Sequence, residues 1–130
     1  MNFEQGDIVK IPFPYSDDTG SKSRPAIVVS NGRLNHVDEM IFVQVTSVPR
    51  ADEFSFPLTP EDLSVPFPPA LNKPCQARCH RISAIHKSKI ERRVAKLKPE
   101  RLHDLIDRVY ALIKQETAKS PQKFSKVPSL

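Results

Sequence analysis

The stretch GDIVKIPFPYSDDTGSKSRPAIVVS, residues 6–30, predicts two strands joined by a polar loop. Its beginning alternates, with Val9, Ile11 and Phe13 on one face, which is the period-two pattern of a half-buried strand. Pro12 predicts that this strand lies at a sheet edge, because proline cannot donate to a ladder. The run PAIVVS that closes the stretch is short, apolar and β-branched, as in strands that are buried on both faces.

Three more segments farther along the chain have strand character. They are MIFVQVTS (40–47), FSFPL (54–58) and CQARCHRISAI (75–85), and each is rich in β-branched, aromatic or alternating residues. Residues 60–74 are too rich in proline for regular pairing. The first two thirds of the chain therefore predict a meander of short strands.

The pattern changes to a helical one at Pro99. Proline fits the first turn of a helix, and Glu100 suits the positive helix N-terminus. The residues that follow form an apolar stripe at helical spacing: Leu102, Leu105, Ile106, Val109, Leu112 and Ile113. Short strands followed by one amphipathic helix predict a mainly β fold, a small, strongly curved β-barrel with a C-terminal amphipathic α-helix.

The length of 130 residues suits one domain with a modest core. We assign residues 1–116 to this domain and residues 117–130, which contain Ser, Pro and Lys without periodicity, to a flexible basic tail. The N-terminus lacks the features of a signal peptide and no apolar run is long enough to span a membrane, so we expect a cytoplasmic protein. In that compartment Cys75 and Cys79 would be reduced.

Charge is distributed unevenly along the chain. Residues 1–72 hold 5 Lys or Arg and 10 Asp or Glu, a net −5, whereas residues 73–130 hold 15 and 5, a net +10. A basic half favours an anionic partner such as nucleic acid, because neutralising phosphates releases counterions. A solvated helix face with a Lys-bearing tail would give the same distribution, and charge alone does not separate the two.

Two polar sites at strand ends can be brought together by strand pairing. Arg24 opens the second predicted strand, and Thr46 and Ser47 close the third. If these strands are antiparallel neighbours, the start of one lies beside the end of the other. Because a residue before proline is held extended, Arg24 has a restricted direction. The plain alternative is an arginine in water and a threonine that caps a strand.

These motifs, in this order, resemble the MazF/PemK family of toxin endoribonucleases from type II toxin–antitoxin modules. The resemblance rests on the GD that precedes the first strand, the loop ending in RPA, the strand ending in TS and the basic segment QARCHRISAIHKSKIERRVAKLKPERLHDLIDRVYALI, and it spans residues 6–113. It implies an SH3-like barrel of the CcdB/PemK type, a homodimer and a cognate antitoxin protein as partner. It also implies sequence-specific cleavage of single-stranded RNA with no metal and no cofactor.

The resemblance also implies site residues. The arginine of the RP motif and the threonine of the TS motif are catalytic in the family, and they correspond to Arg24 and Thr46. A second family arginine, in an R-C-D sequence, corresponds to Arg78. Here the acidic residue of that sequence is replaced by His80, whose imidazole can itself exchange protons near neutral pH. Ser47 follows Thr46 as a phosphate contact.

Further RNA contacts are expected from residues near these motifs. Tyr15 has two possible roles, because its ring can stack on a base or cover the core. The expected set is Ser47, Tyr15, Ser23, Arg81 and Lys87.

Two other readings of the sequence remain open. Cys75, Cys79, His80 and His86 form C-x3-C-H-x5-H, four potential zinc ligands, although an alternating strand would point His80 away from both thiols. The other reading is a non-catalytic binding protein of the same fold, either a CcdB-like toxin that poisons DNA gyrase or a nucleic-acid-binding module. A gyrase binder has no use for an arginine that clamps a phosphate beside a hydroxyl.

Overall fold

The computed structural model of this protein describes residues 2–14, 20–64 and 74–115. Tyr15 and the tail at 117–130 lie outside these ranges, as does most of the proline-rich segment. No helix in the described ranges is both long and apolar enough to cross a membrane.

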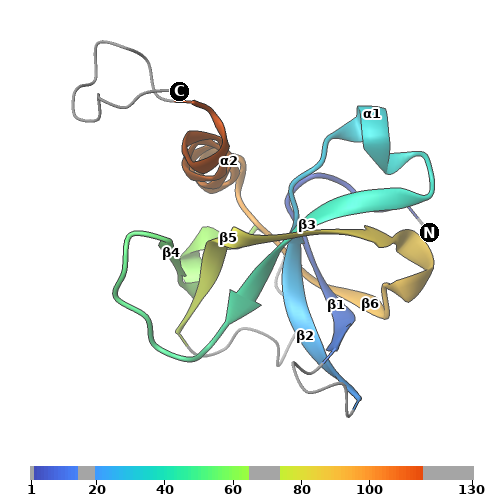
Figure 1. Cartoon of the computed structure of the whole chain (residues 1–130), viewed down its shortest axis with the longest axis horizontal. Coiled ribbons are helices and arrows are strands. Elements are labelled where there is room, and N and C mark those ends of the chain that lie inside the picture. The colour runs from blue at the N-terminus through green and yellow to red at the C-terminus, as the bar shows by residue number, and fades with distance from the viewer. Residues whose placement is uncertain (1, 15–19, 65–73, 116–130) are drawn as a thin grey trace.

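Six strands form one antiparallel sheet, which curls on itself (Figure 1). The spatial order is β4-β5-β3-β2-β1-β6. The strands are β1 (Asp7–Pro14), β2 (Ser21–Val28), β3 (Glu39–Thr46), β4 (Ser55–Leu58), β5 (Cys75–His86) and β6 (Arg92–Lys96). The helices are α1 (Gly32–Asn35) and α2 (Pro99–Ile113), with 3-10 turns η1 (Pro60–Asp62) and η2 (Lys87–Lys89).

This architecture confirms the predicted mainly β fold with a C-terminal helix. The five predicted strands and the helix beginning at Pro99 are all present. The strand β6 was not predicted, because its sequence RRVAK is too charged to show strand alternation. It covers the outer side of β1.

The prediction that β1 is an edge strand is wrong, since β1 lies between β2 and β6. Pro12 is tolerated for a local reason. The strand β6 pairs only with the first half of β1, from Asp7 to Lys10, so Pro12 lies beyond the last pair and needs no donor on that side.

The sheet has a buried cluster on each face. The larger cluster includes Ile8, Ile27 and Val43 from the central strands, with Leu105 and Val109 of α2 packed against them. The smaller cluster lies on the opposite face and consists of Val9, Ile11, Ala26, Val28, Met40 and Phe42. Both faces of the central strands are therefore buried over most of their length.

The start of β1 is fixed by the pair Gly6 and Asp7. Gly6 has a φ of 95°, and its N–H donates to the carbonyl of Val28 at 2.8 Å. Asp7 is 1% exposed and forms ion pairs with Arg93 at 3.1 Å and Lys96 at 3.3 Å. The GD motif thus ties β1 to β2 on one side and to β6 on the other.

We expect Gly6→Ala to destabilise the fold. The positive φ disfavours a side chain, and an added Cβ would lie 3.2 Å from Cδ2 of Leu102, so the loss should be about 1–3 kcal/mol. Urea unfolding measures it, and the matched control is Gly32→Ala, where no atom lies within 4 Å of the added Cβ. Equal unfolding midpoints for the two variants would contradict this role of Gly6.

Candidate functional site

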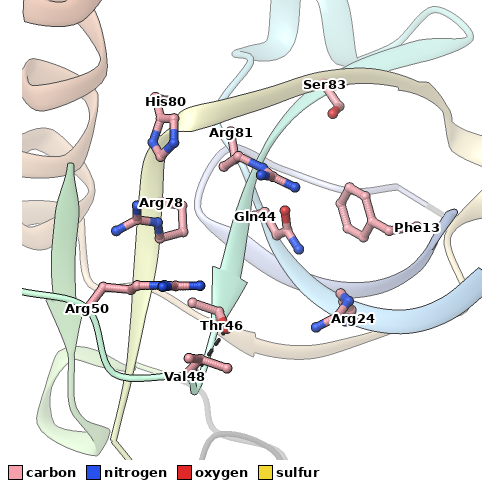
Figure 2. A pocket seen from close by; sticks show the side chains of 10 residues that line it. All are labelled: Phe13, Arg24, Gln44, Thr46, Val48, Arg50, Arg78, His80, Arg81 and Ser83. Atoms are coloured by element: carbon pink, nitrogen blue, oxygen red, sulfur yellow. Dashed lines mark hydrogen bonds between the residues drawn. The ribbon is translucent and has the colours of Figure 1, made fainter. Parts of the chain in front are cut away.

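A cleft of about 660 Å³ opens where the smaller apolar cluster ends (Figure 2). On β1, β2 and β3 the face that buries this cluster continues to Phe13, Arg24 and Gln44, so the surface changes there from apolar to polar. The lining residues are Phe13, Arg24, Gln44, Thr46, Val48, Arg50, Arg78, His80, Arg81 and Ser83.

The sheet opens between β2 and β3 beside Arg24. The ladder between these strands runs from Val28 opposite Phe42 to Ala26 opposite Gln44, and it stops before Pro25, which has no N–H to donate. Two residues farther in the same register, Arg24 would face Thr46. Both side chains line the cleft, as the strand-end argument predicted.

The position of Arg24 within its strand differs from the prediction. The strand β2 begins at Ser21, so Arg24 lies inside it, paired with Ile11 of β1, and does not open it. The ladder to β1 holds the residues on both sides of Arg24, and residues 21–23, which were predicted to belong to the loop, are part of it. Its backbone is therefore fixed on the β1 side and free on the β3 side, where the cleft lies.

The opposite wall of the cleft is an irregular part of β5. The strands β3 and β5 pair regularly as far as Val43 opposite Ile82, and pairing resumes at Val45 opposite Ala77. Between these pairs β3 has one residue, Gln44, and β5 has four, residues 78–81. Bulges of this kind bend a strand and redirect its side chains.

The bulge lets adjacent residues face the same cleft. In a regular strand neighbouring side chains point to opposite faces, so His80 and Arg81 could not share a site. Here Arg78, His80 and Arg81 all line the cleft, as Figure 2 shows. Cys79, between them, is buried in the larger cluster on the other face.

Arg78 is held by a carboxylate that the sequence analysis missed. Its Nη1 and Nη2 donate to the two oxygens of Asp52 at 2.8 and 3.0 Å, and Nη1 also donates to Oγ of Ser55 at 2.7 Å. The hydrogen bond from Arg78 is the largest cause that lowers the pKa of Asp52 to about 2. The side chain of Arg78 is only 13% exposed.

Asp52 and Ser55 belong to a turn, residues 52–55, that leads into β4, and the same turn contacts His80. Its ring packs against Phe54 with centroids 4.8 Å apart, and the N–H of Cys79 donates to the carbonyl of Phe54 at 2.9 Å. The sequence signal for this turn is Asp52, because an aspartate side chain can accept a hydrogen bond from the N–H two residues later, here that of Phe54. Nothing in that signal showed that the turn lies beside Arg78.

The cleft is strongly basic. Four arginines line it, and none of the described residues that line it carries a carboxylate. Within the described residues, no hydrogen bond or ion pair is found for the side chains of Arg24, Arg50 or Arg81. Guanidinium groups in this arrangement bind anions, and their planar forks match phosphate oxygens. Arg50, Gln44 and Phe13 were not predicted as site residues. Phe13 and Gln44 reach the cleft through the positions of β1 and β3 in the sheet, and Arg50 lies in the segment that follows β3.

The other predicted contact residues are not brought to the cleft. The hydroxyl of Ser23 donates to Glu91 at 2.8 Å, on the face of β2 opposite to Arg24. The Nζ of Lys87 donates to the carbonyl of Asn35 at 2.9 Å, at the far end of β5. Ser47 is exposed beside Thr46 but is not among the lining residues, and Tyr15 lies outside the described residues.

The potential zinc ligands do not converge. Cys75 and Cys79 are buried in the larger cluster, and burial raises the pKa of the Cys75 thiol to about 11. His80 lies on the opposite face, in the cleft. Across the part of the chain that the structure describes, no group of three or more His, Cys, Asp or Glu side chains could hold a metal ion.

Comparisons with known proteins agree with this arrangement. The chain matches the model of the family described as PemK-like, MazF-like toxin of type II toxin-antitoxin system over residues 4–113. No match was found among curated proteins.

Several solved structures share the fold. MazF in a MazE–MazF crystal structure from Deinococcus radiodurans has a TM-score of 0.65 and 20% identity, covering 87% of this chain and 97% of that one. An endoribonuclease from a mycobacterial species, in complex with its cognate antitoxin, has a TM-score of 0.62 and 15% identity, covering 93% and 99%. The Mycobacterium tuberculosis toxin MazF-mt6 has a TM-score of 0.59 and 14% identity, covering 79% and 93%.

Proposed function

This chain belongs to the PemK-like, MazF-like family of toxins from type II toxin–antitoxin systems, and from that premise we propose that it is a metal-independent endoribonuclease that cuts single-stranded RNA. The observation that carries the proposal is the cleft in which Arg24 and Thr46 meet Arg78 and His80. Solved structures with the same fold include endoribonucleases from mycobacterial species. We also propose that the folded domain spans residues 1–116 and that residues 117–130 form a tail.

Cleavage of RNA by its own 2′-hydroxyl requires the cleft to perform three tasks. The 2′-hydroxyl must lose its proton as its oxygen attacks the adjacent phosphorus, the phosphorane oxygens must be stabilised, and the departing 5′-oxygen must gain a proton. The products are a 2′,3′-cyclic phosphate and a 5′-hydroxyl. Arginine suits the second task, and its N–H groups can donate toward the third.

Side chains of this cleft can be assigned to those tasks. We assign phosphorane stabilisation to Arg24 and Arg78, with Thr46 donating its hydroxyl to a phosphate oxygen. His80 is the group that exchanges a proton with the substrate, because imidazole both accepts and donates near neutral pH. We assign contacts with the backbone of the bound strand to Arg81 in the cleft and to Ser47, which is exposed next to Thr46 but does not line the cleft.

The partners follow from the same premise. Single-stranded RNA can place splayed bases against an aromatic ring such as Phe13 while its phosphates meet the arginines. A cognate antitoxin would silence the enzyme by filling the basic cleft with an acidic or amphipathic segment. An enzyme that cleaves mRNA works in the cytoplasm.

We expect a homodimer in solution. The helix stripe is only partly buried by the chain itself, since Leu112 and Ile113 are 42% and 67% exposed, and the neighbouring Tyr110 is 57% exposed. A two-fold dimer would cover such a surface. Sedimentation at micromolar concentration tests this, and a monomer that cleaves RNA at the full rate would contradict it.

Arg24→Ala should lower the cleavage rate by about 100- to 1000-fold, because a donor to the transition state is lost. Arg24→Lys should restore only part of the rate, since lysine keeps the charge without the planar fork. The assay is cleavage of a long RNA in EDTA, followed by mapping of the ends. The matched control is Arg33→Ala on α1, an exposed arginine outside the cleft. Near-normal cleavage by Arg24→Ala would remove this residue from the catalytic group.

His80→Ala should slow cleavage at every pH, whereas the wild-type rate should bend within about a unit or two of neutrality. His80→Asp, which restores the residue type of the family sequence, should remain active with a displaced pH profile. The measurement is the cleavage rate as a function of pH, with the exposed His103→Ala as the control. An alanine variant with the wild-type profile would show that the proton transfers take place elsewhere.

A further inference from the structure

The turn at residues 52–55, between β3 and β4, contacts three successive residues of the β5 bulge. Asp52 and Ser55 accept hydrogen bonds from the Arg78 guanidinium. The carbonyl of Phe54 accepts from the N–H of Cys79 at 2.9 Å, and the Phe54 ring packs on His80. One short turn thus holds the bulge residues, for which β3 provides no regular partners.

The turn is itself fixed from within. Oδ1 of Asp52 accepts from the N–H of Phe54 and from Oγ of Ser55, both at 3.2 Å. Ser55 is 8% exposed and pairs with Arg78 in the ladder between β4 and β5. Asp52 therefore presents its carboxylate in a defined direction, and a bidentate pair with an arginine restricts the guanidinium to one plane.

We propose that the 52–55 turn sets the orientation of Arg78 and His80 in the cleft, and that Asp52 is a positioning residue for Arg78. This inference rests on the proposed endoribonuclease function. A guanidinium has five N–H donors, and three of those of Arg78 are used by Asp52 and Ser55. The other two, on Nε and Nη2, are left for a phosphate oxygen.

Asp52 is a poor candidate to take over proton transfer from the carboxylate that the family sequence has at position 80. A carboxyl group with a pKa of about 2 is ionised at neutral pH and binds a proton weakly, so its basicity is low. Both of its oxygens already accept hydrogen bonds from Arg78. Its contribution is therefore geometric, and His80 remains the group that exchanges protons.

The test is the cleavage kinetics of Asp52→Asn on an oligonucleotide that spans a mapped cleavage site. An amide has the shape of the carboxylate but not its charge or its second acceptor, so Arg78 loses its bidentate partner. We expect kcat to fall by about 10- to 100-fold, with KM changed much less, because small misplacements of a catalytic group cost this much. The shape of the pH profile should not change.

Two further variants separate positioning from other roles. The double variant Asp52→Asn/Arg78→Ala should be no slower than Arg78→Ala alone, because Asp52 acts through Arg78. Glu53→Gln is the matched control, an exposed carboxylate next in the chain, and should cleave like the wild type. Ser55→Ala, which removes one acceptor of Arg78, should give a smaller loss in the same direction and serves if Asp52→Asn fails to fold.

A second readout does not depend on cleavage. The rotation rate of the Arg78 guanidinium can be measured by NMR on ¹⁵N-labelled protein. It should be slow in the wild type and in Glu53→Gln, and fast in Asp52→Asn. If the wild type does not cleave RNA, the proposed function fails while this measurement still decides whether the turn holds Arg78. Fast rotation in the wild type would overturn the inference.

Three kinetic outcomes would also overturn it. A wild-type rate in Asp52→Asn would show that the ion pair has no role in the reaction. A faster rate would show that Asp52 withholds Arg78 from the substrate. Additive losses in the double variant would show that Asp52 does not act through Arg78.

Discussion

The site depends on the interruption of pairing between β3 and β5. Four residues of β5 lie opposite Gln44, and this excess allows Arg78, His80 and Arg81 to face one cleft although two of them are adjacent. The same interruption removes the ladder that would hold these residues in place. On its other side β5 keeps the pairing of Arg78 with Ser55 of β4, and Asp52 and Phe54 of the 52–55 turn add further contacts, so this wall of the cleft is positioned by β4 and by the turn that precedes it.

Electrostatics explain why this support takes the form of an ion pair. Four arginines in one cleft repel one another, and Arg78, whose side chain is 13% exposed, forms an ion pair with Asp52. Asp52 offsets the positive charge of Arg78. Because Asp52 is not among the residues that line the cleft, the basic surface stays available to an anion. The arrangement keeps the cleft cationic while the guanidinium of Arg78 is paired where it is buried.

The sequence predicted the strands and helix well, and the site in part. Alternation in β1 and helical spacing in α2 are local signals, which a short stretch of sequence contains. The prediction that Arg24 lies near Thr46 needed only one further assumption, that their strands are antiparallel neighbours. The strand β6 gave no such signal, because its residues are charged. Asp52 and Phe54 could not be found either, since a contact across more than twenty residues depends on how the sheet curls. Family resemblance named Arg78, but not the partner that holds it.

The pairing of the first strand with the last has a consequence for synthesis of the protein. Asp7 and its partner Lys96 are 89 residues apart, so the sheet cannot close until most of the chain has left the ribosome. Contacts between such distant residues form late and slow the folding of β proteins. The larger buried cluster also needs Leu105 and Val109 of α2. Nascent chains that already contain Arg24 and Thr46 therefore lack a finished barrel until β6 and α2 have also emerged.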